Sequence, residues 1–313
     1  MFESDILEDE RRCYEYFKNN NIERREQLRK CYKTNPITDV PQAAAEYIFA
    51  KFRSFQKEQE KRLKSKNEKK NGTSLVFVIN DLHIPEHDEK AVKIVFECII
   101  DNQPDELVLN GDIIDCYWAS RFLKKPDNKI FIQQEADMFY RIFSSLRKHI
   151  PNTKITYILG NHEDRIEKRM IEDPAFFGIK NLSIKKLLRL DELGIHLTKQ
   201  KYEIKDLIIC HGEKCSSRSG YTAKAEFEAH KMRTGISGHV HRLGCHYRSS
   251  EPDDTTKWYE NACLCKKDPD YIKGPVDWQT GFSIVKFFPN RSPQINSIEI
   301  DNNTFEWNGI IYI

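Results

Sequence analysis

Five short apolar runs rich in Val and Ile constrain the fold of this chain more than any other feature of its sequence. The runs are Leu75–Ile79, Glu106–Leu109, Ile155–Leu159, Leu207–Cys210 and Gly235–Ser237. Their length is typical of buried strands, and stretches of mixed charge that look helical lie between them. Later runs at 282–288 and 295–300, followed by 305–313, predict a β-rich end. This alternation predicts an α/β domain in which helices cover sheets.

The first 72 residues lack these apolar runs. In this part Ile48, Phe52 and Phe55 share one face of a predicted helix, because they are spaced four and three residues apart. Asn71 and Gly72 then give a strong stop signal. We therefore predict two parts, a helical N-terminal extension over residues 1–72 and a larger domain over residues 73–313.

A basic tract ends the N-terminal extension. Between Lys61 and Lys70 six basic residues stand against a single acid, Glu68. Such a tract could guide a polyanion such as nucleic acid, although charge runs are usually solvated helix faces. The N-terminal helices could equally serve to form a homo-oligomer, and the sequence leaves these readings open.

Composition and charge exclude several classes of protein. The 50 basic and 48 acidic residues among 313 leave a net charge of +2, so no global field points to nucleic acid or to a membrane surface. We expect no membrane span, because no apolar run approaches 20 residues. The acidic start lacks the apolar segment of a secretory signal, and nine cysteines at irregular spacings fit reduced thiols. We therefore expect a cytoplasmic globular protein.

Each of the five apolar runs is followed at once by side chains that bind metals. These side chains are Asp81, His83, Asp112, Asn161, His211, His239 and His241. Loops beyond the carboxyl ends of strands are where α/β sheets build their sites, so five segments could converge there. The seven oxygen and nitrogen ligands exceed the need of one ion. They suit two ions of Mn, Fe, Zn or Ni about 3.5–4 Å apart, if one carboxylate bridges them.

The local spacing within these loops supports the same interpretation. Asp81 and His83, like His239 and His241, are two residues apart, which places both side chains on one side of an extended segment. The glycines that precede Asp112, Asn161 and His239 would allow tight turns. Any one of these short patterns alone is commonly an ordinary turn or helix cap, but five in order, each after an apolar run, favour a metal centre.

The cysteines offer a second metal hypothesis. Cys263 and Cys265, with the neighbouring pair Cys245 and His246, could hold a structural zinc ion. Their spacing matches no standard zinc pattern, so we interpret these cysteines as buried thiols that are not ligands.

The ordered motifs resemble those of the calcineurin-like metallophosphoesterase superfamily. The motifs are Asp81-x-His83, Gly111-Asp112-x-x-Asp115, Gly160-Asn161-His162-Glu163, His211 and Gly238-His239-x-His241. The resemblance covers about residues 73–288. It implies a four-layer α/β/β/α sandwich that carries two divalent metal ions. Of Mn, Fe, Zn and Ni, we expect Mn.

The resemblance also implies a role for each residue. One metal would be held by Asp81, His83 and His241, the other by Asn161, His211 and His239, with Asp112 bridging the two. A metal-bridged hydroxide would attack phosphorus. His162 would then stabilise the transition state or protonate the leaving oxygen, with a pKa suited to that task. Asp115 would orient His162 or a ligand, or else serve only as a helix cap.

The substrate is less tightly constrained. The phosphoprotein phosphatases of this superfamily carry two arginines where this chain has Leu159 and Cys116. The run from Gly111 to Phe122 instead resembles phage and prophage metallophosphoesterases. Substrate contacts could come from Tyr117, which would stack a base, and from Arg121 or Arg165 in place of the absent arginines. We interpret the neighbouring Trp118 as a core residue and not as a substrate contact.

Three functions remain open from the sequence. The favoured one is a phosphodiesterase or nuclease that hydrolyses nucleic acid or a nucleotide. The second is a phosphomonoesterase that acts on a protein or a small molecule. The third is a non-catalytic binding module, which the complete ligand set disfavours, because a scaffold does not need seven metal-binding side chains.

Overall fold

The computed structural model places most of the chain after residue 71 and part of the chain before it. It describes residues 13, 15–17, 19, 20, 22, 25–36, 40–50, 72–121, 124, 130–176, 179, 181–251, 254–267 and 276–313. The chain separates into two compact units, Met1–Asn71 and Gly72–Ile313. The basic tract at 61–70, with Phe52 and Phe55, lies outside the described residues.

The described part of the first unit is helical. It includes α2 (Arg25–Thr34) and a helical segment at 42–50. These helices enclose a small apolar core of their own, in which the rings of Phe17 and Phe49 meet edge to face at 5.2 Å. The hydroxyl of Tyr32 donates to the carbonyl oxygen of Val40 at the edge of this core.

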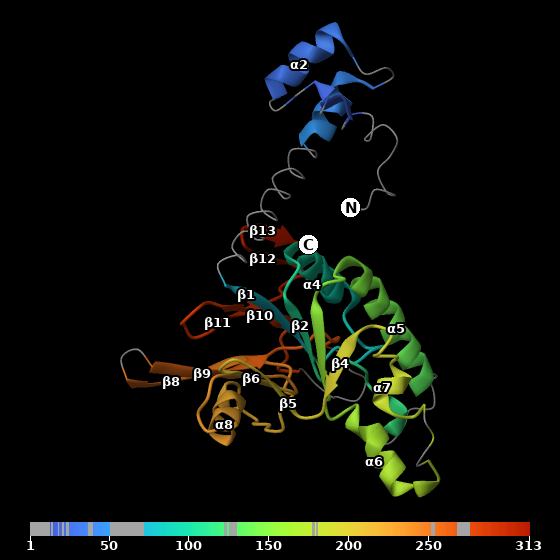
Figure 1. Cartoon of the computed structure of the whole chain (residues 1–313), viewed down its shortest axis with the longest axis vertical. Helices are drawn as coiled ribbons and strands as arrows, with labels where there is room; N and C mark the ends of the chain where they lie inside the picture. The colour runs from blue at the N-terminus through green and yellow to red at the C-terminus, as the bar shows by residue number, and fades with distance from the viewer. Residues whose placement is uncertain are drawn as a thin grey trace. The chain divides into compact units, whose positions relative to one another are not determined.

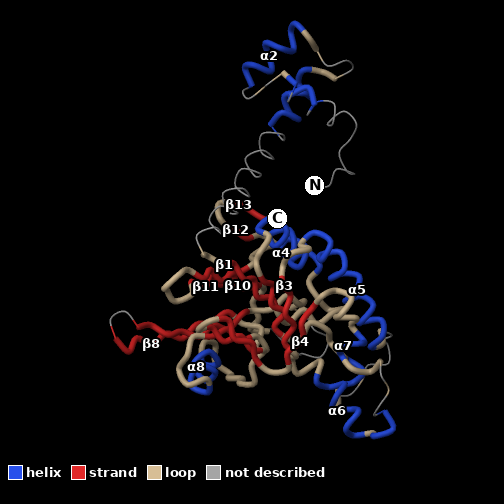
Figure 2. The backbone as a smooth tube through the Cα atoms, viewed as in Figure 1, coloured by secondary structure: helices blue, strands red, loops and turns tan. Residues whose placement is uncertain are grey.

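Two sheets form the second unit (Figures 1 and 2). The first sheet has the order β11-β10-β1-β2-β3-β4. Its strands are β1 (Ser74–Ile79), β2 (Glu106–Asn110), β3 (Lys154–Ile158), β4 (Ile195–Thr198), β10 (Gly281–Phe287) and β11 (Gln294–Glu299). Strands β1 to β4 are parallel, and β10 and β11 complete the sheet in antiparallel pairing.

The second sheet has the order β5-β6-β7-β9-β8. Its strands are β5 (Lys201–Ile204), β6 (Leu207–Cys210), β7 (Gly235–Ser237), β8 (Leu243–Glu251) and β9 (Asp254–Asn261). Strands β6, β7 and β9 are parallel, whereas β5 and β8 pair antiparallel at the two edges. A separate hairpin of β12 (Phe305–Trp307) and β13 (Ile310–Tyr312) ends the chain.

Helices cover the outer face of each sheet. The helices are α4 (Glu89–Asn102), α5 (Ile132–His149), α6 (Asp164–Glu172), α7 (Ile184–Leu187) and α8 (Tyr221–Ala229), with short 3-10 turns η2 (Tyr117–Ala119) and η3 (Pro174–Phe176). In Figure 1, α4 and α5 lie on the side of the first sheet, and α8 lies below the second. No helix among the described residues is long and apolar enough to span a membrane.

Successive side chains along a strand point alternately to the covering helices and to the other sheet, and this alternation forms the layers of the sandwich. In β1, Phe77 and Ile79 pack with α4 and α5, whereas Val76 and Val78 face the second sheet. The four side chains are at most 2% exposed, and burial of each contributes about 1.5–3 kcal/mol. In β6, Leu207 and Ile209 join the layer between the sheets, and the alternate residues pack under α8. The α/β/β/α sandwich predicted from the sequence is confirmed.

Candidate metal centre

The predicted ligands all lie in loops that follow strand ends. Asp81 and His83 come after β1, and Asp112 comes after β2. Backbone hydrogen bonds tie these two loops together: Asp81 N–H donates to Gly111 O at 3.0 Å, and His83 N–H donates to Asp112 O at 2.9 Å. In the second sheet, Gly238 N–H donates to His211 O at 2.8 Å. The parallel strands therefore bring their loops to one edge of the sandwich.

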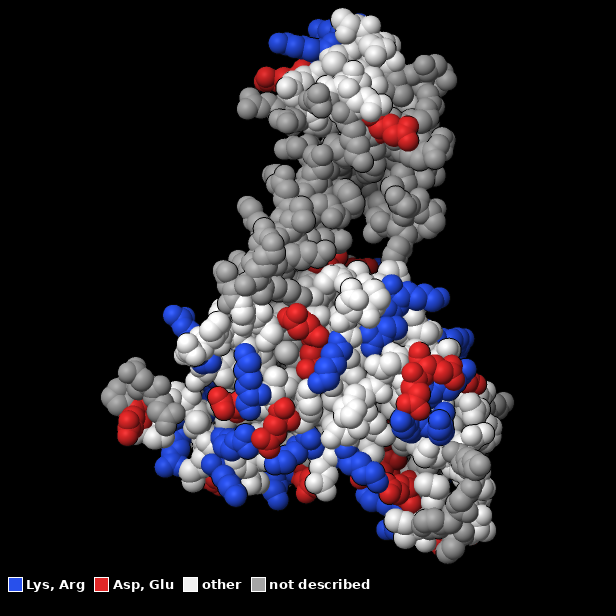
Figure 3. Space-filling view, in the orientation of Figure 1, with Lys and Arg blue, Asp and Glu red and all other residues white. Residues whose placement is uncertain are grey.

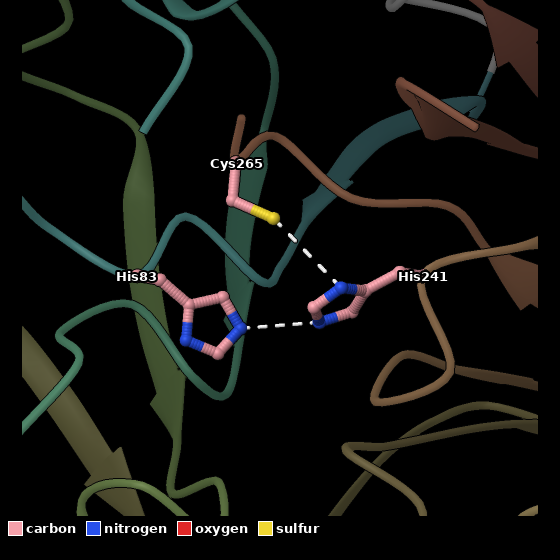
Figure 4. A group of neighbouring side chains, drawn as sticks. All are labelled: His83, His241 and Cys265. Carbon is pink, nitrogen blue, oxygen red and sulfur yellow. Dashed lines mark hydrogen bonds between the residues drawn. The ribbon is translucent and has the colours of Figure 1, made fainter. Parts of the chain in front are cut away.

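The first group of ligands is Asp81, His83 and His241. His241 Nε2 lies 3.1 Å from Asp81 Oδ1 and 3.1 Å from His83 Nε2. His83 Nε2 is 3.7 Å from Asp81 Oδ1. Figure 4 shows the two imidazoles facing each other through these nitrogens. All three side chains are at least nine-tenths buried.

The second group is Asn161, His211 and His239. His211 Nε2 lies 3.1 Å from Asn161 Oδ1. The rings of His211 and His239 meet edge to face at 5.3 Å between centroids. His211 is buried, whereas Asn161 and His239 are partly exposed, so this group is the more open of the two.

Asp112 lies between the two groups. Its Oδ2 is 3.2 Å from His211 Nε2 and 4.0 Å from His83 Nε2. It belongs to two clusters of metal-binding atoms, one with Asp81 and His83 and the other with His211 and His239, each within 4.8 Å. One carboxylate thus reaches both groups, which is the arrangement that a bridging ligand requires.

The spacing and polarity of these atoms fit metal ions. Two ligand atoms at about 2.1 Å from one ion, at tetrahedral to octahedral angles, are about 3.0–3.4 Å apart. Of the four distances given above between ligand atoms of the same group, three match, at 3.1 Å each, and the fourth is 3.7 Å. His211 Nδ1 faces the carbonyl oxygen of Asn110 at 3.0 Å, so this nitrogen carries the hydrogen. Nε2 then faces the oxygens of Asn161 and Asp112, and one cation could bind all three atoms together.

The backbone at the ligands is in an unusual conformation. Asp81, His83, Asp112, His239 and His241 have φ angles of 52°, 49°, 50°, 71° and 59°. Side chains with a Cβ adopt this left-handed region at a cost of about 1–2 kcal/mol each, and Asp is more tolerant than most. Non-glycine residues in this region cluster at functional sites, because the surrounding structure must hold them there. Five of the seven predicted ligands share the feature.

Buried opposite charges dominate the electrostatics of the centre. Burial raises the pKa of Asp81 and of Asp112, but the facing imidazoles of His241 and His211 lower each pKa well below its ordinary value. Burial lowers the pKa of His211, and Asp112 opposes it, which leaves the pKa raised to about 10. The pKa of His239 is lowered, first by burial and then by the charge of His211. The carboxylates of Asp81 and Asp112 therefore favour a positive charge within the ligand centre.

His162 lies beside the predicted bridge. Its Nδ1 is 2.8 Å from both Oδ1 and the carbonyl oxygen of Asp115, and its Nε2 is 3.7 Å from Asp112 Oδ2. Arg165 Nη1 donates to the same carbonyl oxygen at 2.9 Å, and Arg165 Nη2 is 2.6 Å from His162 Nε2. Asp115 Oδ1 also lies 3.5 Å from His83 Nδ1. Asp115 thus contacts both His162 and a predicted ligand, and it caps none of the described helices.

Glu163 has a function that the sequence analysis did not assign. It is fully buried, and its carboxylate accepts backbone hydrogen bonds from Asp112 at 3.1 Å, Ile113 at 2.8 Å and Gly160 at 2.9 Å. The Tyr157 hydroxyl donates to it at 2.6 Å. This carboxylate holds the loop of the bridging residue in place. The motif Gly-Asn-His-Glu contains the signal, but the sequence does not show where the carboxylate points.

Two glycines make room for the acidic ligands. A Cβ at Gly160 would collide with the carboxylate and backbone nitrogen of Asp112, and one at Gly238 would lie 2.6 Å from Asp81 Oδ2. The prediction that these glycines avoid a Cβ clash is confirmed, although neither has a positive φ. Gly111 does have a positive φ, of 81°. Close approach to a ligand is the reason at the other two.

The proposed substrate side chains lie in different surroundings. Arg165 is at the centre, as described. The guanidinium of Arg121 is 73% exposed and pairs with Glu172 on α6. The ring of Tyr117 packs edge to face on Trp118 at 5.6 Å and lies under Lys124 Nζ, and Trp118 stacks on Phe131.

The interpretation of the cysteines as buried thiols holds for Cys263 and Cys265, whereas Cys245 is half-buried. Cys265 Sγ also lies within 4.8 Å of ligand atoms of His83 and His241. All nine lie among the described residues and no disulfide joins them, and Cys263 and Cys265 are buried. Cys265 Sγ lies 3.8 Å from His241 Nδ1, on the side of the ring opposite to His83 (Figure 4). With the Trp278 ring 4.2 Å from that of His241, this thiol fixes the orientation of a predicted ligand.

A cleft of about 580 Å³ opens beside the second ligand group. Its wall includes Asn161, His211 and His239 together with residues of α6, the β4–β5 turn and α8. Its basic side chains are Lys168, Lys199, Lys201 and Lys214. The centre is therefore accessible from the side of the more open group.

Sequence comparisons agree with this site. The family model for calcineurin-like phosphoesterases matches residues 74–273. The Gene 54 protein of Mycobacterium phage L5 is 28% identical over 230 residues, and the match covers 67% of this chain and 88% of the phage protein. The Gene 54 protein of Mycobacterium phage D29 is 25% identical over 235 residues with the same coverage.

Solved structures of Vps29 are also similar, at low TM-scores. Vacuolar Protein Sorting 29 from Cryptosporidium parvum has a TM-score of 0.39 and 14% identity, over 76% of this chain and 94% of that chain. Chaetomium thermophilum Vps29 has a TM-score of 0.39 and 12% identity, over 74% and 88%. The assignment therefore rests on the family model, which spans more than half of the chain and all the predicted ligands. This chain belongs to the calcineurin-like phosphoesterase family, whose members are metal-dependent phosphoester hydrolases.

Proposed function

We propose that this protein is a phosphodiesterase that uses two divalent metal ions to hydrolyse phosphodiester bonds of nucleic acid or nucleotides. The observation that supports it most is the position of Asp112, whose carboxylate belongs to both ligand groups. Asp81, His83 and His241 would hold one ion, and Asn161, His211 and His239 the other. We propose Mn as the native metal, because the ligands combine carboxylate and amide oxygens with imidazoles and include no thiolate.

The side chains divide the work of the reaction. Two divalent ions, when bound, supply a water of lowered pKa and neutralise the phosphoryl oxygens. His162 is positioned to give a proton to the leaving oxygen, because Asp115 fixes its Nδ1 and leaves Nε2 directed toward Asp112. Arg165 Nη2 adds a positive charge beside that nitrogen.

The surroundings of the centre favour a diester over a monoester. A monoester dianion carries one more charge than a diester and is commonly gripped by a pair of arginines. Arg165 is the one candidate from the sequence analysis that lies at the centre, since Arg121 pairs with Glu172. Phosphomonoesterase activity is the second candidate, favoured by the position of Arg165 beside His162.

A pair of chromogenic substrates tests this proposal. We expect Mn-loaded protein to hydrolyse bis-p-nitrophenyl phosphate with a higher kcat/KM than p-nitrophenyl phosphate. The matched control is the same preparation after treatment with EDTA, which should lose both activities and recover them with Mn. A reversed preference would favour the monoesterase, and activity that survives EDTA would contradict the metal centre.

We also propose that the protein works in the cytoplasm. None of the nine cysteines is in a disulfide, and six of them are buried. Thiols that stay reduced in this number are typical of a reducing compartment.

A further inference from the structure

We propose that the cleft beside the second ligand group binds a single strand of nucleic acid through its phosphates, without selecting bases. This inference deepens the proposed function and rests on it for the position of the scissile bond. Asn161, His211 and His239 belong to the wall of the cleft, so a strand whose scissile phosphate lies at the centre would also contact the cleft.

Charge along the cleft supports a polyanion. Four lysines line it, at positions 168, 199, 201 and 214. Lys199 Nζ pairs with Glu167 at 3.1 Å and Lys201 Nζ pairs with Glu203 at 2.9 Å, and neither glutamate lines the cleft. These two lysines are therefore partly neutralised.

The other two lysines are the main candidates for phosphate contacts. Both Lys168 and Lys214 are exposed. Within the described part of the chain, neither forms an ion pair within 4 Å. They come from different elements, Lys168 from α6 and Lys214 from the loop after β6. Their ammonium groups are thus available to different phosphates of one chain.

Acidic groups of the cleft oppose part of this charge. Asp164 and Glu213 line it as well; burial raises the pKa of Asp164, whereas the charge of Lys168 lowers it. Glu226 is only 2% exposed, and its Oε1 accepts the backbone N–H groups of Glu213 and Lys214 at 2.7 Å each. The Glu226 carboxylate therefore holds the loop that carries Lys214 instead of repelling a ligand.

The size and lining of the cleft determine the kind of nucleic acid. A volume of about 580 Å³ is that of a site for a drug-sized ligand, which is one or two nucleotides and too small for a duplex. No Phe, Tyr or Trp is among the described residues that line it, so stacking on bases is absent there. Figure 3 shows Lys and Arg side chains, with Asp and Glu among them, over β5 and α8, where the surface is hollowed toward α6.

Binding measurements on the full chain test this inference. All proteins carry His162→Asn to prevent turnover, and the probe is fluorescein-labelled dT12, followed by anisotropy between 50 and 200 mM KCl. The test variant is Lys168→Ala with Lys214→Ala. The matched control is Lys93→Ala with Lys185→Ala, which removes two charges from α4 and α7, outside the cleft.

Two phosphate contacts define the expected result. At 100 mM KCl the cleft variant should bind dT12 on the order of tenfold more weakly, and its slope of log K against log salt should be smaller by about 1.4. The control should stay within twofold of the parent, and dA12 should bind within about threefold of dT12.

Other results would overturn the inference. If the cleft variant binds dT12 as tightly as the control, the strand binds elsewhere, for example at the N-terminal unit. If a poly-glutamate peptide of the same length binds as tightly as dT12 and responds to the same substitutions, the cleft prefers an acidic protein segment. Because binding is measured without turnover, it separates from the proposed function, which the chromogenic substrates test.

Discussion

The Nδ1 atom of His162 lies 2.8 Å from Oδ1 of Asp115. A carboxylate accepts only, so His162 donates from Nδ1, which leaves Nε2 as the nitrogen that gives or takes a proton. That nitrogen faces Asp112 Oδ2 at 3.7 Å. Asp115 therefore orients His162 so that Nε2, the nitrogen that exchanges the proton, faces Asp112. His162 itself belongs to neither ligand group.

Substitution should separate metal binding from turnover. Asp112→Asn should lose bound metal and activity together, because Asp112 reaches both ligand groups. His162→Asn should keep the metal while kcat falls by about 10²–10⁴-fold, the usual contribution of a general acid. Metal content by atomic emission and kcat for bis-p-nitrophenyl phosphate are the two measurements. Full activity with full metal in both variants would refute the assignment.

Asp115 should act as a positioning residue. Asp115→Asn keeps the shape but replaces the charged acceptor that fixes His162 with a neutral amide, so kcat should fall by about 10–100-fold. KM should change less than kcat, and the limb of the pH–rate profile that reports His162 should shift. A variant with an unchanged pH profile and unchanged kcat would show that Asp115 has no part in orienting His162.

Glu163 should be important for stability. Glu163→Ala leaves four buried backbone N–H groups and the Tyr157 hydroxyl without their acceptor, at a cost on the order of 3 kcal/mol. The matched control is Glu167→Ala on α6, an exposed residue whose pair with Lys199 contributes less than about 1 kcal/mol. Urea unfolding of both variants measures the difference, and equal midpoints would contradict the structural function of Glu163.

A methyl group at Gly160 should disturb the bridge. In Gly160→Ala the new Cβ collides with the carboxylate of Asp112, so this side chain must move. We expect metal affinity to fall at least tenfold. Gly194→Ala is the control for an added methyl group, because nothing lies within 4 Å of that position. Its positive φ of 61° would cost stability but should leave metal affinity unchanged.

Glu135 should make stability depend on pH. It is buried under η2, accepts Cys116 N–H at 2.7 Å, and burial raises its pKa to about 8 from 4.5. Between these values the folded state binds the extra proton, so rising pH lowers the free energy of unfolding by up to about 1.4 kcal/mol per unit. The loss is complete above about pH 8.

Comparison with Glu135→Gln isolates this effect from other titrating groups. Urea unfolding at pH 5, 6, 7 and 8 should show the parent losing stability relative to the variant across the window. Parallel curves for the two proteins would mean that Glu135 titrates near its ordinary value in the folded state.

Much of the fold follows from local pattern. The strands β1, β2, β3, β6 and β7 occur where the apolar runs predict them, within one residue at each end. The sequence analysis did not predict β4, β5, β8 and β9. In β8 the burial changes from partly buried to exposed without alternation, so the strand leaves no periodic signal.

The residue types that follow each strand, and therefore the chemistry that they can perform, can be read from the sequence. Which of these residues meet depends on the tertiary structure. Asp112 and His211 are 99 positions apart, and parallel strands in two packed sheets bring them within 3.2 Å. Packing likewise turns Glu163 back to the Asp112 loop and pairs Arg121 with Glu172. It also brings lysines from separate elements to one cleft. Side-chain direction and long-range approach depend on the whole sandwich, and no local pattern encodes them.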